Sequence, residues 1–296
     1  MRLARLSLAF SIAWALWAGE TVERPFRGVT HIIRTETEPR SLRIHVVKID
    51  LTAPGISFKL TAPSGTRETV RQTTLEFLKQ EGAKIAINAH YFLPWPTQDR
   101  AVWLVGLAAS NGVRYSAFER PEQSYALMAD APALNIDRRN RAAIVHRDPA
   151  DPSGAGTLEK VALWTTIAGS AQIVTAGRKT VPAYTEGQLE PGGPGNYSNA
   201  KSWYDAVNAR TAIGLTRNRR ALVLFTVDAR GGSAGMQVGE VADMLIRDYG
   251  VYDALNLDGG GSTSLAMNGA LVNTSSDNPD GRAVGSNLAI FARPMQ

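Results

Sequence analysis

Apolar runs rich in β-branched residues make up most of the chain, whereas helical spacing of apolar residues is confined to two stretches. Residues 29–34, 42–51 and 56–62 are such strand-like runs, and Pro54-Gly55 is typical of a turn between the last two. We therefore expect an antiparallel sheet near the amino terminus.

The first helical stretch is predicted over residues 66–81, with Ser64 or Thr66 as its cap and Gly82 as its end. Its apolar residues lie roughly on one helical face (Val70, Leu75, Phe77 and Leu78).

A buried strand is expected over residues 83–88, and further strands joined by tight turns are expected within 103–109 and 124–129. Together these patterns predict an α+β fold: a mixed, mostly antiparallel sheet with a few packed helices, in a single domain over residues 19–296.

One loop differs in composition from its surroundings. Residues 185–201 hold four glycines and two prolines, which is typical of a lid over a pocket or of a surface loop. As a lid, this region would offer Tyr197, Trp203 or Tyr204 as an aromatic face for a sugar ring.

The candidate chemistry lies in the last third of the chain. Residues 221–227 form an apolar strand that ends at Asp228, and residues 254–257 form another that ends at Asp258. Between them, residues 237–249 carry a helical apolar stripe that stops before a glycine. A helix between two strands generally makes the strands parallel, so we expect both aspartates at one edge of the sheet, where ligands of such sheets bind.

Three glycines and two hydroxyl side chains follow Asp258, and all five are candidates for substrate binding (Gly259, Gly260, Gly261, Ser262 and Thr263). Glycines permit positive φ angles and let a ligand approach main-chain N–H groups, which bind anions. The spacing is that of neither a Walker loop nor a dinucleotide-binding loop. A tight hairpin is predicted at Asn268-Gly269, joining residues 265–267 to 270–273.

Composition narrows the chemistry further. The 296 residues are 44% hydrophobic and 20% charged, as in globular proteins, and include no cysteine. Disulfides, thiol nucleophiles and cysteine-ligated metals are therefore excluded, and the four histidines lack the spacing of an H-E-x-x-H zinc site. The net charge of +5 is too small to indicate a nucleic-acid partner.

The amino terminus has the features of a secretory signal. Arg2 and Arg5 precede an apolar stretch over residues 6–17, so residues 1–18 are predicted to be a signal peptide. The stretch is shorter than the ~20 residues that span a bilayer, so no stable membrane span is expected, and an uncleaved amphiphilic anchor is the alternative. Export without disulfides predicts a secreted or periplasmic bacterial protein.

Residues 256–263, N-L-D-G-G-G-S-T, closely resemble the signature of the phosphodiester glycosidase family. Residues 87–92 are similar to its N-G-G-Y-F motif and residues 210–214 match its R-T-A-I-G, whereas its D-G-R is changed to D-A-R at 228–230. The resemblance, which covers residues 83–291, implies a hydrolase, and the amino-terminal pattern implies that it is exported. Its expected reaction is cleavage of the glycosidic C–O bond of sugar-1-phosphodiesters, such as N-acetylglucosamine-1-phosphodiester, in bacterial exopolysaccharide or wall glycans.

Such cleavage needs a phosphate clamp and negative charge near the anomeric carbon, and little acid assistance because phosphate is already an acidic leaving group. Asp258 is the predicted carboxylate facing the sugar, and Asp228 either activates water or orients an arginine. Asn88 is a candidate partner of sugar hydroxyls. Three arginines are candidates for binding the phosphate (Arg210, Arg230 and Arg282). No cofactor is expected to be required.

Two alternatives stay open. A non-catalytic module for exopolysaccharide assembly would bind sugar phosphate with the same clamp and would tolerate loss of either aspartate. A metal-dependent phosphodiesterase would break the P–O bond, with Asp228, Asn256 and Asp258 binding Ca²⁺ or Mg²⁺. Every alternative takes a small or polymeric sugar phosphate as its partner, and none sets the oligomeric state.

Overall fold

The computed structural model of the protein is built mainly from β-sheets. The described residues are 19–118, 131–182, 204–274 and 278–295. Within them the chain forms four sheets and two α-helices, and every strand pairing is antiparallel. The predicted mostly antiparallel α+β class is therefore right in its coarse form, although strands dominate. The predicted signal peptide, the strand at 124–129 and the loop at 185–201 lie outside the described residues.

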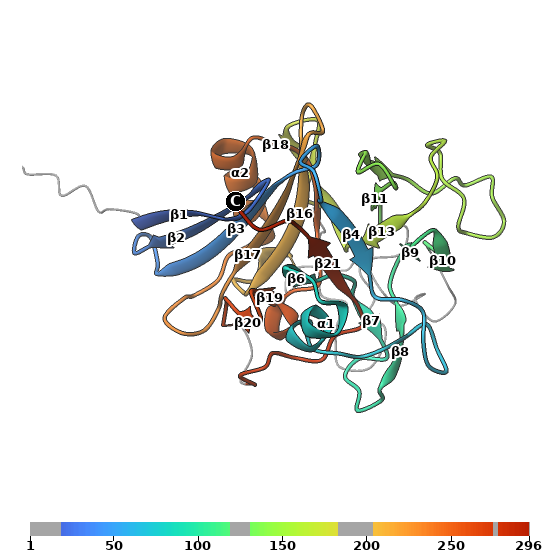
Figure 1. Cartoon of the computed structure of the whole chain (residues 1–296), viewed down its shortest axis with the longest axis horizontal. Helices are drawn as coiled ribbons and strands as arrows, with labels where there is room; N and C mark the ends of the chain where they lie inside the picture. Colours follow the sequence, from blue (N-terminus) through green and yellow to red (C-terminus); the bar gives the residue numbers. More distant parts are fainter. Residues whose placement is uncertain (1–18, 119–130, 183–203, 275–277, 296) are drawn as a thin grey trace, which may run out of the picture.

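The largest sheet has eight strands (Figure 1). In spatial order they are β1 (Gly19–Phe26), β2 (Val29–Glu36), β3 (Leu42–Asp50), β17 (Ala221–Val227), β16 (Arg210–Thr216), β18 (Val251–Asn256), β14 (Ala171–Thr175) and β15 (Arg178–Lys179). Both β17 and β18 pair antiparallel with β16, so they run parallel to each other with β16 between them. This confirms that Asp228 and Asp258, which follow these strands, lie at the same edge of the sheet.

Helix α2 (Val238–Tyr249) covers one face of the large sheet, as the sequence pattern predicts. Gln237 and Glu240 form a capping box at its start, and Gly250 ends it in the left-handed conformation at a φ of 65°. Val241 and Leu245 belong to the same buried apolar cluster as Phe225 of β17. The helix therefore buries one face of the strand that leads to Asp228.

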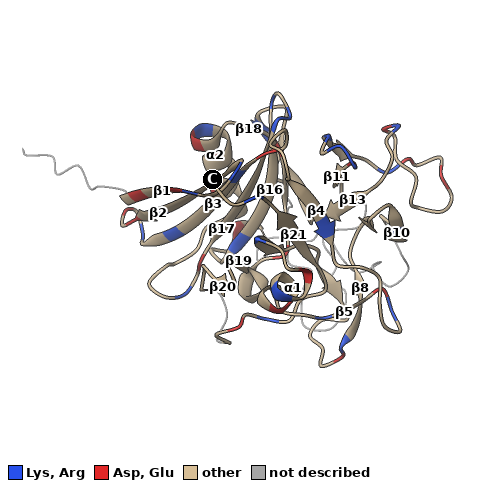
Figure 2. Cartoon of the chain, viewed as in Figure 1, with Lys and Arg blue, Asp and Glu red and all other residues tan. Residues whose placement is uncertain are grey.

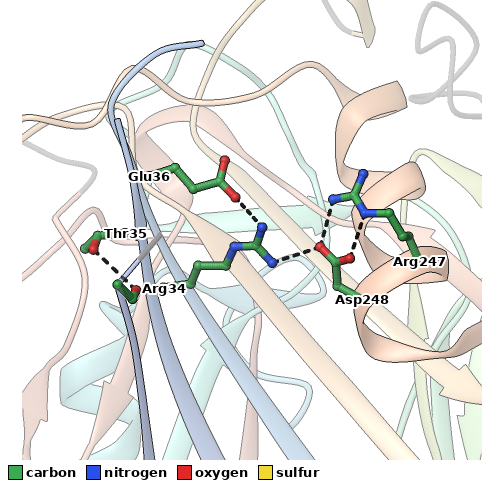
Figure 3. A network of polar contacts seen from close by, with 6 residues as sticks. Arg34, Thr35, Glu36, Arg247 and Asp248 are labelled. Atoms are coloured by element: carbon green, nitrogen blue, oxygen red, sulfur yellow. Dashed lines mark hydrogen bonds and ion pairs between the residues drawn. The ribbon is translucent and has the colours of Figure 1, made fainter. Parts of the chain in front are cut away.

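An ion-pair network joins strand β2 of this sheet to the end of α2 (Figure 3). Arg34 of β2 lies 2.5 Å from Glu36 and 2.8 Å from Asp248, and Asp248 also lies 2.7 Å from Arg247. The Arg34 and Asp248 side chains are only 18% and 20% exposed, so solvent screens this pair less than a fully exposed one. The network fixes β2 to the last turn of the helix.

The second sheet packs on the other face of the large sheet. Its strands in order are β20 (Ala270–Leu271), β19 (Leu265–Met267), β6 (Ile85–Asn88), β21 (Asn287–Phe291) and β4 (Ser57–Leu60). Ile85 and Ile87 of β6 share a central core with Leu224 of β17, whereas Ala86 between them packs against α1 (Thr74–Glu81). Two helices therefore enclose two stacked sheets, in the order α2, large sheet, second sheet and α1.

The remaining strands form two smaller sheets beside this stack. A five-stranded sheet contains β10 (Val113–Ser116), β9 (Ala108–Ser110), β13 (Thr165–Ala168), β11 (Ala133–Ile136) and β12 (Ala142–Val145). A three-stranded sheet contains β5 (Thr69–Val70), β8 (Ala101–Leu104) and β7 (Phe92–Leu93). No helix within the described ranges is long and apolar enough to cross a membrane.

Three predicted elements need correction. The helix expected over 66–81 begins only at Thr74, because Thr73 and Glu76 form a capping box there and Thr69–Val70 is strand β5. The run at 56–62 does not join the amino-terminal sheet, because β4 pairs with β21 of the second sheet.

The run at 103–109 is the third correction, because it divides into β8 and β9. Gly106 separates them at a φ of 93°, and a Cβ there would lie 2.4 Å from that of Ala168. Only glycine fits this position, so the chain turns where apolar composition alone predicted continuity. The hairpin at Asn268-Gly269 is confirmed, with positive φ angles of 53° and 84°.

Candidate active site

Asp258 lies where β18 leads into the glycine-rich turn, and it is only 8% exposed. Its main chain is held on both sides, because its N–H donates to the Ala89 carbonyl at 3.1 Å and its carbonyl accepts from Asn88 Nδ2 at 2.6 Å. The carboxyl group bonds Ser262 and the Gly259 N–H of the turn, whose glycines are partly exposed. This geometry presents a carboxyl group at the sheet edge while keeping bulk water largely away.

Burial raises the pKa of the Asp258 carboxyl from 3.8 to about 7. A hydrogen bond from Ser262, the positive charge of Arg282 and a backbone hydrogen bond from Gly259 oppose that rise. The group therefore changes its charge near neutral pH, which is typical of carboxyl groups at catalytic sites.

Asn88, predicted to contact sugar hydroxyls, is completely buried and holds the turn together. Besides donating to the Asp258 carbonyl, its Oδ1 accepts from Thr211 Oγ1 and from the Ser264 N–H, both at 3.0 Å. These bonds join β6, β16 and both ends of the glycine-rich turn. In the described structure Asn88 thus positions Asp258 from below.

The glycine-rich turn contains a single 3₁₀ turn, η3 (Gly260–Ser262). Of its three glycines only Gly260 has a positive φ, at 58°. Gly261 is required by proximity instead, because a Cβ there would lie 2.3 Å from Nη2 of Arg282. The predicted close approach to the main chain is therefore made, in this structure, by an arginine of the protein itself.

Arg282 is held by an aromatic side chain that the sequence analysis missed. Its guanidinium carbon lies 4.8 Å from the centre of the Trp95 ring, and Nη1 donates to Ser262 Oγ at 3.4 Å. Trp95 in turn packs edge-on against Phe92, with ring centres 5.4 Å apart. Asp258, Ser262, Gly261, Arg282 and Trp95 therefore form one cluster, which we call the Asp258 cluster.

Arg71 fastens the loop that carries Trp95. Its Nη1 donates to the carbonyls of Thr97 and Asp99 at 2.9 and 3.1 Å, and its Nε donates to the Ala283 carbonyl at 3.2 Å. Burial, followed by the positive charge of Arg282, lowers the pKa of Arg71. Two arginines thus lie close together at this end of the sheet, as expected of a site that attracts anions.

Asp228 is fully buried, and its carboxylate bonds the segment that ends the β19–β20 hairpin, which we call the carboxy-terminal hairpin. Its Oδ1 accepts from Asn273 Nδ2 at 2.9 Å and its Oδ2 accepts from the Thr274 N–H at 3.0 Å. Asn273 also donates to the Thr263 carbonyl at 3.1 Å and accepts from the Leu265 N–H at 2.6 Å. Burial raises the pKa of Asp228. Both carboxylate oxygens therefore hold the segment that follows the glycine-rich turn.

The other two predicted arginines occupy different surroundings. Arg210 is only 4% exposed, its Nε donates to the Met236 carbonyl at 2.9 Å, and its Nη2 bonds the Ala206 carbonyl. Arg230 is exposed on the loop after Asp228. Arg282 contacts the glycine-rich turn at Gly261 and Ser262.

A buried polar group lies behind the turn and includes Asn256, which the metal hypothesis named as a ligand. Asn256 donates through Nδ2 to Ser170 Oγ at 2.8 Å and to the Tyr91 hydroxyl at 3.2 Å. Burial, followed by the negative charge of Asp258, raises the pKa of Tyr91. Tyr204 is buried too and bonds the Ser170 carbonyl, whereas Tyr197 and Trp203, its partners in the expected aromatic platform, lie outside the described residues.

The three residues of the metal hypothesis have different hydrogen-bond partners. Asp228 bonds the carboxy-terminal hairpin, Asn256 bonds Tyr91 and Ser170, and Asp258 lies with Ser262 and Arg282. Among the described residues, no group of three or more histidine, aspartate or glutamate side chains is arranged to hold a metal ion.

Comparisons with known proteins agree on one family. A model of the phosphodiester glycosidase family matches residues 81–291. Human and mouse N-acetylglucosamine-1-phosphodiester α-N-acetylglucosaminidases are 41% and 40% identical to this chain over 73 residues. That stretch is 25% of this chain and 14% of each relative, so the match spans a small part of these curated relatives.

Solved structures share the fold. The catalytic domain of the zebrafish N-acetylglucosamine-1-phosphodiester α-N-acetylglucosaminidase, auto-inhibited by pro-peptide, matches with a TM-score of 0.63 and 21% identity over 93% of this chain and 87% of its own. A hypothetical protein from Synechocystis matches with a TM-score of 0.60 and 19% identity over 90% of this chain and 62% of its own.

Proposed function

The chain belongs to the phosphodiester glycosidase family, and from that premise we propose that it hydrolyses the glycosidic C–O bond of a sugar-1-phosphodiester. The observation that carries the proposal is the Asp258 cluster, in which a buried carboxyl group lies with Arg282 beside partly exposed glycines. An N-acetylglucosamine-1-phosphodiester is the first substrate to test, because relatives with that activity share a 73-residue stretch with this chain.

In the proposed reaction the bond between C1 and the phosphate oxygen breaks, and the electron pair leaves with the phosphate monoester. The ionised Asp258 stabilises the positive charge that develops on the sugar, while Arg282 and the N–H groups of the glycine-rich turn hold the phosphate. Water adds to C1 and releases a proton, which leaves a free sugar and a phosphate monoester. No cofactor enters this scheme.

Isotope labelling tests which bond breaks. The protein is incubated with an N-acetylglucosamine-1-phosphodiester in ¹⁸O-labelled water, beside Asp258→Asn and the remote control Asp137→Asn. Asp137 is a carboxylate of a hairpin in the β11–β12 region that bonds only its own turn. We expect label on sugar C1, lost in Asp258→Asn and retained in Asp137→Asn. Label in the phosphate would contradict the proposal and favour a phosphodiesterase.

We also propose that the protein is exported and acts on bacterial exopolysaccharide or wall glycans, as a secreted or periplasmic enzyme. The charged and apolar pattern of residues 1–18 supports export. The mass of the mature protein recovered from the periplasm or medium tests this proposal. A chain that keeps residues 1–18 and stays in the cytoplasm would contradict it.

A further inference from the structure

A hollow lies at the end of the large sheet opposite to Asp258. It measures about 700 Å³ and is formed by the turn between β1 and β2, the end of β3 and the hairpin between β16 and β17. Strand β17 begins at Ala221 in this hollow and ends at Val227, next to Asp228. Its seven residues at about 3.3 Å each place roughly 20 Å between the two ends. The hollow is therefore separate from the Asp258 cluster.

Positive charge dominates the lining of the hollow. Arg24, Arg27, Lys48 and Arg220 line it, against one carboxylate, Asp50. The hydroxyl and N–H of Thr52 both bond the Asp50 carboxylate, and the hydroxyl bond is the main cause that lowers its pKa. Figure 2 shows basic and acidic positions dispersed along the chain.

The cations of the hollow are weakly compensated by the protein. Within the described ranges none of the three arginine side chains donates a hydrogen bond or lies in an ion pair, and all three residues are exposed. Lys48 is half-buried, with its ammonium 5.2 Å from the centre of the Tyr249 ring. Arginine forks of this kind match the paired oxygens of phosphate groups.

We propose that this hollow is a second binding site, which takes a discrete anionic ligand carrying more than one phosphate group. Its volume lies within the range of small-ligand sites, about 300–1,000 Å³. Several phosphates are needed to balance four cations against one carboxylate. The site does not depend on the activity proposed for the Asp258 cluster.

Calorimetric titration with inorganic tripolyphosphate tests the site. All proteins carry Arg282→Gln, which removes the phosphate-binding arginine of the other end. To this background we add Arg27→Gln with Arg220→Gln, or the control pair Arg139→Gln with Arg178→Gln, which removes equal charge from exposed positions outside the hollow. We expect the first pair to weaken binding by about tenfold or more and the control pair to change it less than about twofold.

Several outcomes would overturn the proposal. Equal weakening by both pairs would mean that the ligand responds only to net charge. Absence of binding in the Arg282→Gln background would mean that the hollow is not a phosphate site. Binding to phosphatidylglycerol vesicles without binding to tripolyphosphate would assign the hollow to a membrane. Because the four arginines of the two pairs are exposed, neither pair should change the melting temperature of the Arg282→Gln background.

Discussion

Asp258 experiences two opposing electrostatic influences, and burial is the stronger. Arg282, Ser262 and the Gly259 N–H favour the ionised carboxylate, yet the pKa still rises to about 7. A carboxyl group on an exposed turn would stay ionised far below that pH. The surroundings of this one residue therefore make its charge sensitive to pH in the neutral range.

Activity should follow the ionisation of Asp258. Because the proposed scheme uses the ionised form, we expect kcat/KM to increase with pH and to level off above about 7. Initial rates with the phosphodiester between pH 5 and 9 measure this dependence. A rate that falls as pH rises through 7 would instead assign Asp258 the role of an acid and contradict the scheme.

Trp95 should act through Arg282. We expect Trp95→Leu to free the guanidinium of Arg282 and to weaken substrate binding. KM should rise by about tenfold, because a cation–π contact worth about 1–2 kcal/mol is lost. Since Arg282 lowers the pKa of Asp258, the acidic limb of the pH profile should also move to higher pH.

Trp164→Leu is the matched control for Trp95→Leu, because it removes a similar arginine–tryptophan contact elsewhere. The guanidinium carbon of Arg138 lies 4.9 Å from the centre of the Trp164 ring, just before β13. It should leave both KM and the pH profile unchanged. An unshifted pH profile in Trp95→Leu would show that Trp95 does not position Arg282.

Substitution of Asn88 can show whether this residue only stabilises the fold or also positions Asp258. Asn88→Ala removes three hydrogen bonds in a buried place, so we expect unfolding in urea to show a loss of about 2–4 kcal/mol. Asn135 makes an equivalent set of bonds to Ala162, Trp164 and Thr166 in the smaller five-stranded sheet.

Asn135→Ala should therefore cost a similar free energy of unfolding. At a temperature where both variants are folded, kcat should fall at least about tenfold in Asn88→Ala and stay at the wild-type value in Asn135→Ala. Equal kcat values would limit Asn88 to a structural role.

At the scale of elements, the carboxy-terminal hairpin is fastened to β17 by Asp228 and Asn273. The hairpin follows the glycine-rich turn directly, and Asn273 bonds the Thr263 carbonyl within that turn. Both oxygens of Asp228 bond Asn273 and Thr274, so the contacts favour a role in holding this hairpin, which differs from the predicted water activation or orientation of an arginine.

A double-mutant cycle tests this link between Asp228 and Asn273, which we call the brace. We expect Asp228→Asn and Asn273→Ala each to lower kcat by about tenfold and the double variant to lower it no further, because one linkage is lost in all three. Rates at saturating substrate supply the measurement. If Asp228→Asn abolishes turnover while Asn273→Ala leaves it intact, Asp228 is the base and the brace is incidental.

Elements with strong local signals could be predicted from the sequence. The helix at α2 combines an apolar stripe with a capping box and a terminal glycine, and Asn268-Gly269 determines the hairpin locally. The start of α1 was misplaced because apolar spacing continues upstream of the Thr73 cap into strand β5. The sheet to which β4 belongs depends on β21, more than two hundred residues later, and no local pattern contains that partner.

In the candidate site too, residues close together in the sequence could be grouped in advance, whereas partners from distant segments could not. Asp258, the glycines and Arg282 lie in or near one motif, and the structure brings them together. Trp95 and Tyr91 come from a distant segment, so only the folded sheets show their proximity. Asn88 was predicted to contact sugar hydroxyls, whereas in the structure its side chain is buried and bonds the turn, a role that depends on partners far away in the sequence.

At the scale of the whole molecule, buried histidines and the buried Asp258 carboxyl make the stability of the fold depend on pH in opposite directions. His90, in the core beside β6, bonds Ser286 and Leu107, and burial lowers its pKa to about 4. His45 contacts His31 at 3.1 Å, and burial lowers its pKa to about 3. Burial of neutral histidine stabilises the fold above the unfolded pKa near 6.5, and this contribution is lost as pH falls through the folded values. Protonated Asp258 stabilises the fold below pH 3.8, and that contribution is lost as pH rises through about 7.

The two contributions overlap and oppose each other between about pH 4 and 6.5, so urea unfolding between pH 4 and 8 separates them by comparison of variants. We expect His90→Gln to reduce the loss of stability between pH 6.5 and 4. Asp258→Asn should remove the decline between pH 4 and 7 and raise stability at pH 8 by up to about 4 kcal/mol. Wild-type and Asp258→Asn curves that stay parallel across this range would mean that the carboxyl group does not carry its proton in the folded protein. The same measurement thus reports the charge of Asp258 without any substrate, and it would stand even if the proposed reaction were wrong.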